Sequence, residues 1–324
     1  MGFVKAMLSN PHILFGVANR LVKPVRLPIN RLYSTIKPYD EDQKKARKLA
    51  KKLAIAASEP RFYQARSSKW TELKKKYDQE VASKEKKVIN VTLLDGKVVE
   101  GFSWDLKPFQ IAQDISHALA QEVCVAKIND QLWDLERPLE ADCKIQLLKF
   151  DSQDAKTAFW TTAAFTLAEA LERLYCTDDG GVVCSIGSTQ TGFFADIDLK
   201  GKTITRKDIG AIDEQITKIL RNHNKVERIE TSKSDANELF AYNPFKLKSI
   251  SERVCDRLPI YRCGSFIEIV DTPLLRKNKN VNVIEILKME PVLCNGQPPI
   301  QRVHGIAFPS HKELKDFLKQ NKLT

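Results

Sequence analysis

The cysteines and histidines are the residues of this chain that could act as nucleophiles, bases or metal ligands, and their spacing favours none of these roles. No two cysteines form a Cys-x-x-Cys pair, and none stands with a histidine at a metal-ligand spacing. The odd, scattered set predicts reduced and mostly buried thiols rather than a disulfide framework. We therefore expect no metal and no cofactor. The seven cysteines are Cys124, Cys143, Cys176, Cys184, Cys255, Cys263 and Cys294.

Cys184 and Cys263 are the candidates for a catalytic nucleophile, but neither has a base close to it in the sequence. Asp271 is a further polar candidate, although a carboxylate at the end of a strand is more commonly a solvated surface group. Gly180-Gly181 stands alone and does not form a glycine-rich phosphate loop. These residues do not predict an enzyme.

Lysines and arginines offer a second kind of chemistry, the neutralisation of phosphate, and they are concentrated near the N-terminus. Residues 1–39 hold six basic and no acidic residues, and residues 40–87 hold fifteen basic against eight acidic ones. A charge run is often only a solvated helix face, but cations interleaved with aromatic rings can also bind RNA phosphates and unpaired bases. The predicted RNA-binding residues are Lys44, Lys45, Arg47, Lys48, Lys51, Lys52, Arg61, Arg66, Lys74, Lys75 and Lys76.

The basic region divides into two segments. Residues 1–35 mix apolar and basic residues and contain no acid, which is typical of a mitochondrial presequence, with a basic tail as the alternative. Residues 36–87 predict a basic helical extension whose second helix begins near Ser67 or Ser68. This arm would provide any contact with RNA.

Two folded segments follow, and both predict mixed α+β structure. Residues 88–150 contain a β-rich run, a turn at Asp95-Gly96, a helix from about Pro108 and further short strands, as in a β-grasp module. Residues 151–324 begin with a helix whose apolar residues recur at steps of three and four and predict one buried stripe. The stripe consists of Trp160, Ala164, Leu167, Leu171 and Leu174.

These two segments resemble the N-terminal half of threonyl-tRNA synthetases. Residues 127–139 are similar to the TGS domain of that family, and residues 159–175 to the first helix of its editing domain. Residues 243–247, 261–270 and 301–309 are similar to later motifs of the same domain, in the same order. The resemblance extends over residues 88–318 and implies a TGS-like β-grasp module followed by an editing-like α+β domain.

In that family, two histidines one helical turn apart and a later Cys-x-x-x-His pair line the pocket that hydrolyses mischarged seryl-tRNA. The resemblance places these four positions at Thr161, Phe165, Val270 and Leu274. Three of them carry aliphatic or aromatic side chains, which cannot transfer a proton or order a water by hydrogen bonds. The resemblance therefore implies a catalytically degenerate domain, in which Phe165 and Leu274 fill the pocket.

The chain also resembles a protein of the large subunit of the mitochondrial ribosome that looks like this half of the synthetase. The resemblance implies a structural, non-enzymatic role in the mitochondrial matrix, with mitochondrial ribosomal RNA and other large-subunit proteins as partners and no small-molecule substrate. No apolar run approaches the ~20 residues that span a bilayer. Two alternatives remain open: a free-standing hydrolase that edits mischarged tRNA, and a non-catalytic, synthetase-derived factor that binds tRNA outside the ribosome.

Overall fold

The computed structural model describes residues 60–177, 181–222, 224–294 and 297–320. The predicted presequence and most of the basic extension lie outside them. The first described helix, α5 (Phe62–Ala82), begins at Phe62 rather than near Ser67. Tyr63 and Arg66 in its first turns are buried. Contacts with distant parts of the chain thus extend the helix beyond the segment that the local sequence pattern predicts.

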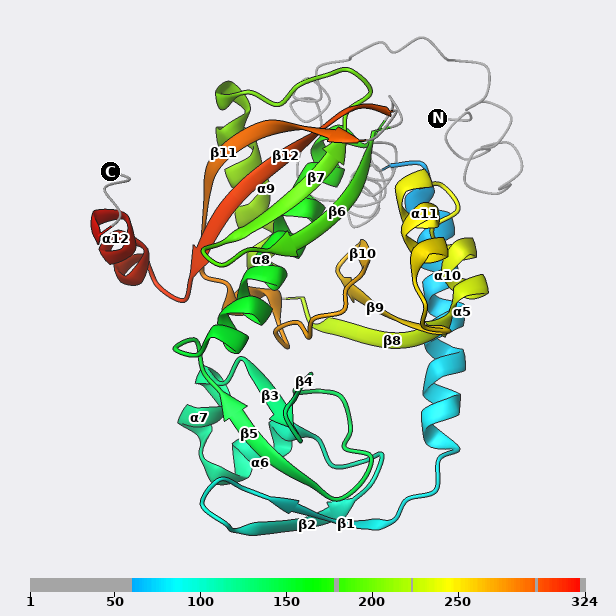
Figure 1. The fold of residues 1–324 in the computed structure, drawn as a ribbon, viewed down its shortest axis with the longest axis vertical. Helices are drawn as coiled ribbons and strands as arrows, with labels where there is room; N and C mark the ends of the chain where they lie inside the picture. The colour runs from blue at the N-terminus through cyan, green and yellow to red at the C-terminus, as the bar shows by residue number, and fades with distance from the viewer. Residues whose placement is uncertain (1–59, 178–180, 223, 295–296, 321–324) are drawn as a thin grey trace, which may run out of the picture. The chain divides into compact units, whose positions relative to one another are not determined.

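The segment after α5 forms a five-stranded mixed sheet with two helices (Figure 1). The predicted hairpin is present: β1 and β2 pair antiparallel, and Gly96 in their turn has a φ of +85°, which glycine adopts readily. The strand order is β2-β1-β5-β3-β4, with β5 parallel to β1. The elements are β1 (Val88–Thr92), β2 (Val98–Phe102), α6 (Pro108–Ile115), α7 (His117–Glu122), β3 (Val125–Ile128), β4 (Gln131–Trp133) and β5 (Cys143–Leu148).

The helix predicted from about Pro108 is two helices, because the chain is extended at Ser116 (φ −168°, ψ 148°). The Ser116 hydroxyl accepts a hydrogen bond from the Leu119 amide at 3.0 Å and so caps the second helix. Ile89 and Val91 point from β1 into the core of this module, where they join Ile111 from α6.

The long helix α8 (Gln153–Tyr175) and a four-stranded antiparallel sheet form the centre of the second segment (Figure 1). The Ser152 hydroxyl caps α8 by accepting from the Ala155 amide at 3.1 Å. The sheet order is β11-β12-β7-β6, and α8 contacts β6, β7 and β12 as well as helix α9. The elements are β6 (Val182–Ser188), β7 (Phe193–Asp198), α9 (Ile209–Arg221), β11 (Val283–Cys294) and β12 (Gln297–Phe308).

A second sheet has three strands in the order β10-β9-β8, and α5 packs against its strand β8 and against helix α10. Trp70 and Leu73 of α5 share a hydrophobic cluster with Ile229, Leu239 and other residues of this sheet and its helices. The elements are β8 (Val226–Ser232), α10 (Lys233–Leu239), α11 (Pro244–Glu252), β9 (Arg257–Cys263) and β10 (Phe266–Ile269), and helix α12 (His311–Gln320) follows β12.

The strands β7 and β12 approach closely at Gly305, which pairs with Phe193. A Cβ atom on Gly305 would lie 2.5 Å from Cζ of the Phe193 ring and 3.0 Å from the Glu285 carbonyl oxygen. The ring is itself buried, with a relative exposure of 1%. Glycine at this position therefore makes room for a core aromatic side chain.

The burial of α8 gives a stability prediction. Leu167 is completely buried, so Leu167→Ala leaves a cavity, and we expect a loss of about 2–5 kcal/mol in the free energy of unfolding. Leu94→Ala is the control, because Leu94 is 78% exposed and should change stability by less than about 0.5 kcal/mol. Denaturant titration measures both, and equal effects would show that α8 is not the core.

Candidate functional site

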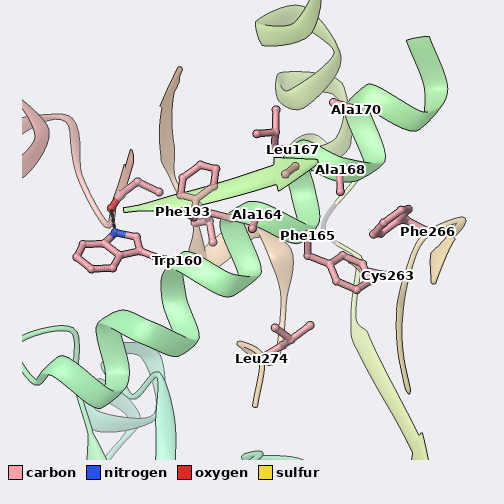
Figure 2. Close-up of a cluster of buried hydrophobic side chains, with 14 of the residues drawn as sticks. Trp160, Ala164, Phe165, Leu167, Ala168, Ala170, Phe193, Cys263, Phe266 and Leu274 are labelled. Carbon is pink, nitrogen blue, oxygen red and sulfur yellow. Dashed lines mark hydrogen bonds between the residues drawn. The ribbon is translucent and has the colours of Figure 1, made fainter. Parts of the chain in front are cut away.

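The two helical positions of the predicted site, Thr161 and Phe165, point into the protein from α8. Their exposed fractions are 3% and 2%. The Thr161 hydroxyl donates to the Thr157 carbonyl oxygen at 2.7 Å, one turn back in the same helix, so its proton is already engaged. Phe165 points towards Phe266 of β10, and the two rings meet edge to face with centroids 4.7 Å apart (Figure 2).

The other two positions, Val270 and Leu274, lie on the segment after β10 and are also buried, at 6% and 2% exposure. Both belong to the hydrophobic cluster that contains Phe165. The structure thus brings the predicted positions into one core and fills it with side chains. Figure 2 shows Trp160 in the same region, where its indole N–H donates to the Ala307 carbonyl oxygen at 3.0 Å.

The segment that carries Leu274 is held by hydrogen bonds from both sides. The Leu274 amide donates to Asp134 at 3.3 Å, and the Leu275 amide donates to the Thr162 hydroxyl at 2.9 Å. Asp134 comes from the β-grasp module and also accepts from the Tyr261 hydroxyl at 2.8 and 2.9 Å. The two modules are therefore joined directly beside the predicted site.

A buried ion pair that sequence reasoning missed lies next to these positions. Lys246 of α11 donates to Glu268 of β10, and both side chains are at most 7% exposed. Burial raises the pKa of the Glu268 carboxyl above its usual value, and the Lys246 ammonium acts in the opposite direction. The second carboxylate oxygen of Glu268 is buried without a hydrogen-bond partner among the described residues. In the sequence, Lys246 and Glu268 fall within the family-like motifs 243–247 and 261–270, but nothing there indicates that they pair.

The pair borders a cavity of about 440 Å³ that Cys184 also lines. Burial raises the pKa of the Cys184 thiol above its ordinary value, and the same holds for Cys263. Both thiols therefore stay protonated near neutral pH and are poor nucleophiles. The arrangement offers an enclosed charge pair and no activated nucleophile in the part of the chain that the structure describes.

No group of three or more His, Cys, Asp or Glu side chains that could hold a metal occurs within residues 60–177, 181–222, 224–294 and 297–320. In the same ranges, no helix combines the length and the apolar character needed to cross a membrane.

The comparisons with known proteins agree with the resemblance. A family model of the TGS domain matches residues 89–149. Cytoplasmic threonine–tRNA ligase of Caenorhabditis elegans is 38% identical over 276 residues, which are 84% of this chain and 38% of that protein. Cytoplasmic threonine–tRNA ligase 1 of Mus musculus is 35% identical over 267 residues, 80% of this chain and 36% of the relative. Cytoplasmic threonine–tRNA ligase 2 of the same species is 32% identical over 317 residues, 94% of this chain and 40% of the relative.

The chain contains a TGS domain and is homologous to the N-terminal region of threonyl-tRNA synthetases. It spans 36–40% of the length of these curated relatives. The predicted α+β fold, with a TGS domain followed by a threonyl-tRNA synthetase-like editing region, is confirmed. The basic arm that was predicted to precede it lies largely outside the described residues.

Of the predicted RNA-binding residues, the six between Lys44 and Lys52 lie outside the described part of this synthetase homologue. Arg61, Lys75 and Lys76 are exposed, and Lys74 is half-buried. Lys74 pairs with Asp78 at 2.6 Å and Lys76 with Asp235 at 2.9 Å. Surface ion pairs of this kind are weak, and RNA binding by these side chains stays a prediction.

Arg66 requires a correction, because its guanidinium lies inside the protein with 2% exposure. It forms a two-pronged ion pair with Glu172 of α8, with N–O distances of 2.6 and 2.8 Å. It also donates to the Tyr242 hydroxyl at 2.8 Å and to the Ser265 carbonyl oxygen at 2.7 Å. Arg66 therefore anchors α5 to the synthetase-like domain and is not available to RNA.

The Arg66 contact gives a prediction for stability. Arg66→Met leaves the Glu172 carboxylate buried without its cation, and we expect a loss of about 3–5 kcal/mol in the free energy of unfolding. The double variant Arg66→Met, Glu172→Leu should recover most of that loss, since no charge stays buried alone. Thermal or denaturant unfolding measures the cycle, with Lys76→Met as the exposed control. Strictly additive single effects would contradict the coupling.

The thiols give a prediction for reactivity. Cys255 is exposed, whereas Cys184 and Cys263 are buried and have raised pKa values. Iodoacetamide at neutral pH should alkylate Cys255 quickly and the other two only after denaturation. Peptide mass spectrometry over a time course measures each site. Fast modification of Cys184 in the folded protein would revive it as a candidate nucleophile.

Proposed function

We propose that this protein is a structural component of the large subunit of the mitochondrial ribosome, the counterpart of large-subunit protein thirty-nine. In this role, its basic N-terminal segment contacts mitochondrial ribosomal RNA in the mitochondrial matrix. Its synthetase-like body contacts neighbouring proteins of the subunit. Residues 1–35 would act as the presequence that delivers it there.

One observation carries the proposal: Phe165, Val270 and Leu274 occupy the editing positions as inert side chains buried in a hydrophobic core. A homologue that retains the frame and has lost these reactive groups is suited to binding rather than to turnover. The positive charge of the first 87 residues adds a phosphate-binding segment to that frame.

A synthetase-derived factor that binds tRNA outside the ribosome is the second candidate, and a specific observation favours it. The alignment with mouse cytoplasmic ligase 2 covers 94% of this chain and so includes most of residues 1–59. The similarity thus extends into the basic N-terminal region. This region could therefore share a tRNA-binding role with the cytoplasmic ligase. A hydrolase of mischarged tRNA is disfavoured by the inert side chains, and it requires measurable deacylation of seryl-tRNA by the purified protein.

Sedimentation tests the ribosomal proposal. In a sucrose gradient of mitochondrial extract, the protein should travel with the large ribosomal subunit, whereas a soluble tRNA-binding factor would stay near the top. Reversing the six charges between Lys44 and Lys52 to glutamate should release most of the protein from the subunit, because each lost phosphate contact weakens binding.

The matched control changes the five lysines of that run to arginine, which preserves the charge and should preserve co-sedimentation. Residues 1–35 are unchanged in both variants, so import is not altered. Unchanged co-sedimentation of the charge-reversed protein would contradict the predicted role of the arm. Absence of the wild-type protein from the large-subunit fractions would sink the ribosomal proposal itself.

A further inference from the structure

A cavity of about 320 Å³ lies where α5, the loop before β5 and the start of β8 meet. Lys74 and Asp78 of α5 and Glu227 of β8 line it, and the same three residues line an adjoining hollow of about 530 Å³. The two hollows therefore lie next to each other along α5. Together their linings hold eight cationic and five acidic residues.

The positive charge in the first cavity gathers around one carboxylate, Glu136. Lys107 and Lys225 each lie 3.4 Å from its Oε2 atom, and Arg276 lies 3.5 Å from its Oε1 atom. Three cations around one carboxylate leave a local excess of positive charge that favours a further anion, in a lining that holds six cationic and five acidic residues in all. Arg228 lines the same cavity, and its buried Nη1 donor has no hydrogen-bond partner among the described residues.

Aromatic rings line the cavity beside these cations. Tyr77 and Trp104 are both half-buried, and the Lys84 ammonium lies 5.4 Å from the centroid of the Trp104 ring. Trp104 has a φ of +61°, a left-handed conformation that is uncommon for a bulky residue. Its amide donates to the Leu139 carbonyl oxygen at 2.7 Å, which holds the strained conformation. Strain of this kind is concentrated at functional sites.

We infer that these hollows bind single-stranded RNA, with a phosphate at the Glu136 cluster and an unpaired base against Trp104 or Tyr77. Cations beside accessible aromatic rings are the combination that recognises phosphate and base together. The second hollow lies beside the first along α5, which favours a strand over a single nucleotide. This site goes beyond the proposed function, because it lies in the body and not in the basic arm.

Photo-crosslinking of full-length protein to a single-stranded oligoribonucleotide with 4-thiouridine, followed by peptide mass spectrometry, tests the inference. Wild-type protein should crosslink within the peptides of Tyr77 or Trp104. Lys225→Gln with Arg276→Gln should reduce that yield about tenfold, because phosphate contacts are lost. Glu136→Gln should raise it, because the competing carboxylate is removed. A binding site predicts that the double variant and Glu136→Gln change the crosslinking yield in opposite directions. A purely structural cluster does not predict this.

Lys97→Gln is the matched control, because Lys97 pairs with Asp95 in the β1–β2 turn and lines neither hollow. It should leave the crosslinks unchanged, and unfolding midpoints should confirm that every variant is folded. The inference is overturned if no cavity peptide crosslinks, or if Glu136→Gln lowers the yield as the double variant does. Competition by adenosine 5′-monophosphate at the concentration of the oligonucleotide would overturn the assignment to a strand.

These variants leave Lys44–Lys52 unchanged. A failure of this inference therefore appears in the crosslink map, whereas a failure of the ribosomal proposal appears in the sucrose gradient.

Discussion

Burial of α8 on all sides is the constraint on which the rest of the structure depends. Sixteen of its residues are buried, because a sheet, a helix and the strand β10 cover it from different directions. A helix in this position has to be apolar or satisfy its polar groups internally. The Thr161, Thr162 and Thr166 hydroxyls do so by donating to carbonyl oxygens one turn back. Phe165 is apolar and has no polar group to satisfy. An unreactive side chain at this editing position therefore suits a buried helix face.

Charges inside the protein connect elements that are far apart in the sequence. Arg66 and Glu172 join α5 to α8, Lys246 and Glu268 join α11 to β10, and Asp134 ties the TGS domain to the segment after β10. Buried pairs of this kind contribute little net stability, since desolvation offsets the attraction. Their geometry is demanding, however, and a wrongly docked element would leave a charge alone in the core. They therefore determine how the elements meet.

The sequence predicted the elements that rest on local patterns. The hairpin at Asp95-Gly96 and the helix through Trp160 are present, since turn chemistry and helical periodicity are local signals. The break at Ser116 was missed, because a serine inside an apolar pattern does not by itself indicate a cap. The sequence alone does not show that Arg66 is buried, because its partner Glu172 is 106 residues away. The Lys246–Glu268 pair was missed for the same reason, since charged residues are seldom buried unless they are paired.

Because β7 and β12 approach closely, substitutions on the two strands have different consequences at their contact. Phe193 can be exchanged for a smaller apolar residue, which leaves a void but no collision. Gly305 cannot become larger, because the added atom would meet the Phe193 ring or the backbone of β11. Substitutions at this contact are therefore tolerated on β7 and not on β12. Side chains there can become smaller but not larger without disturbing the sheet that supports α8.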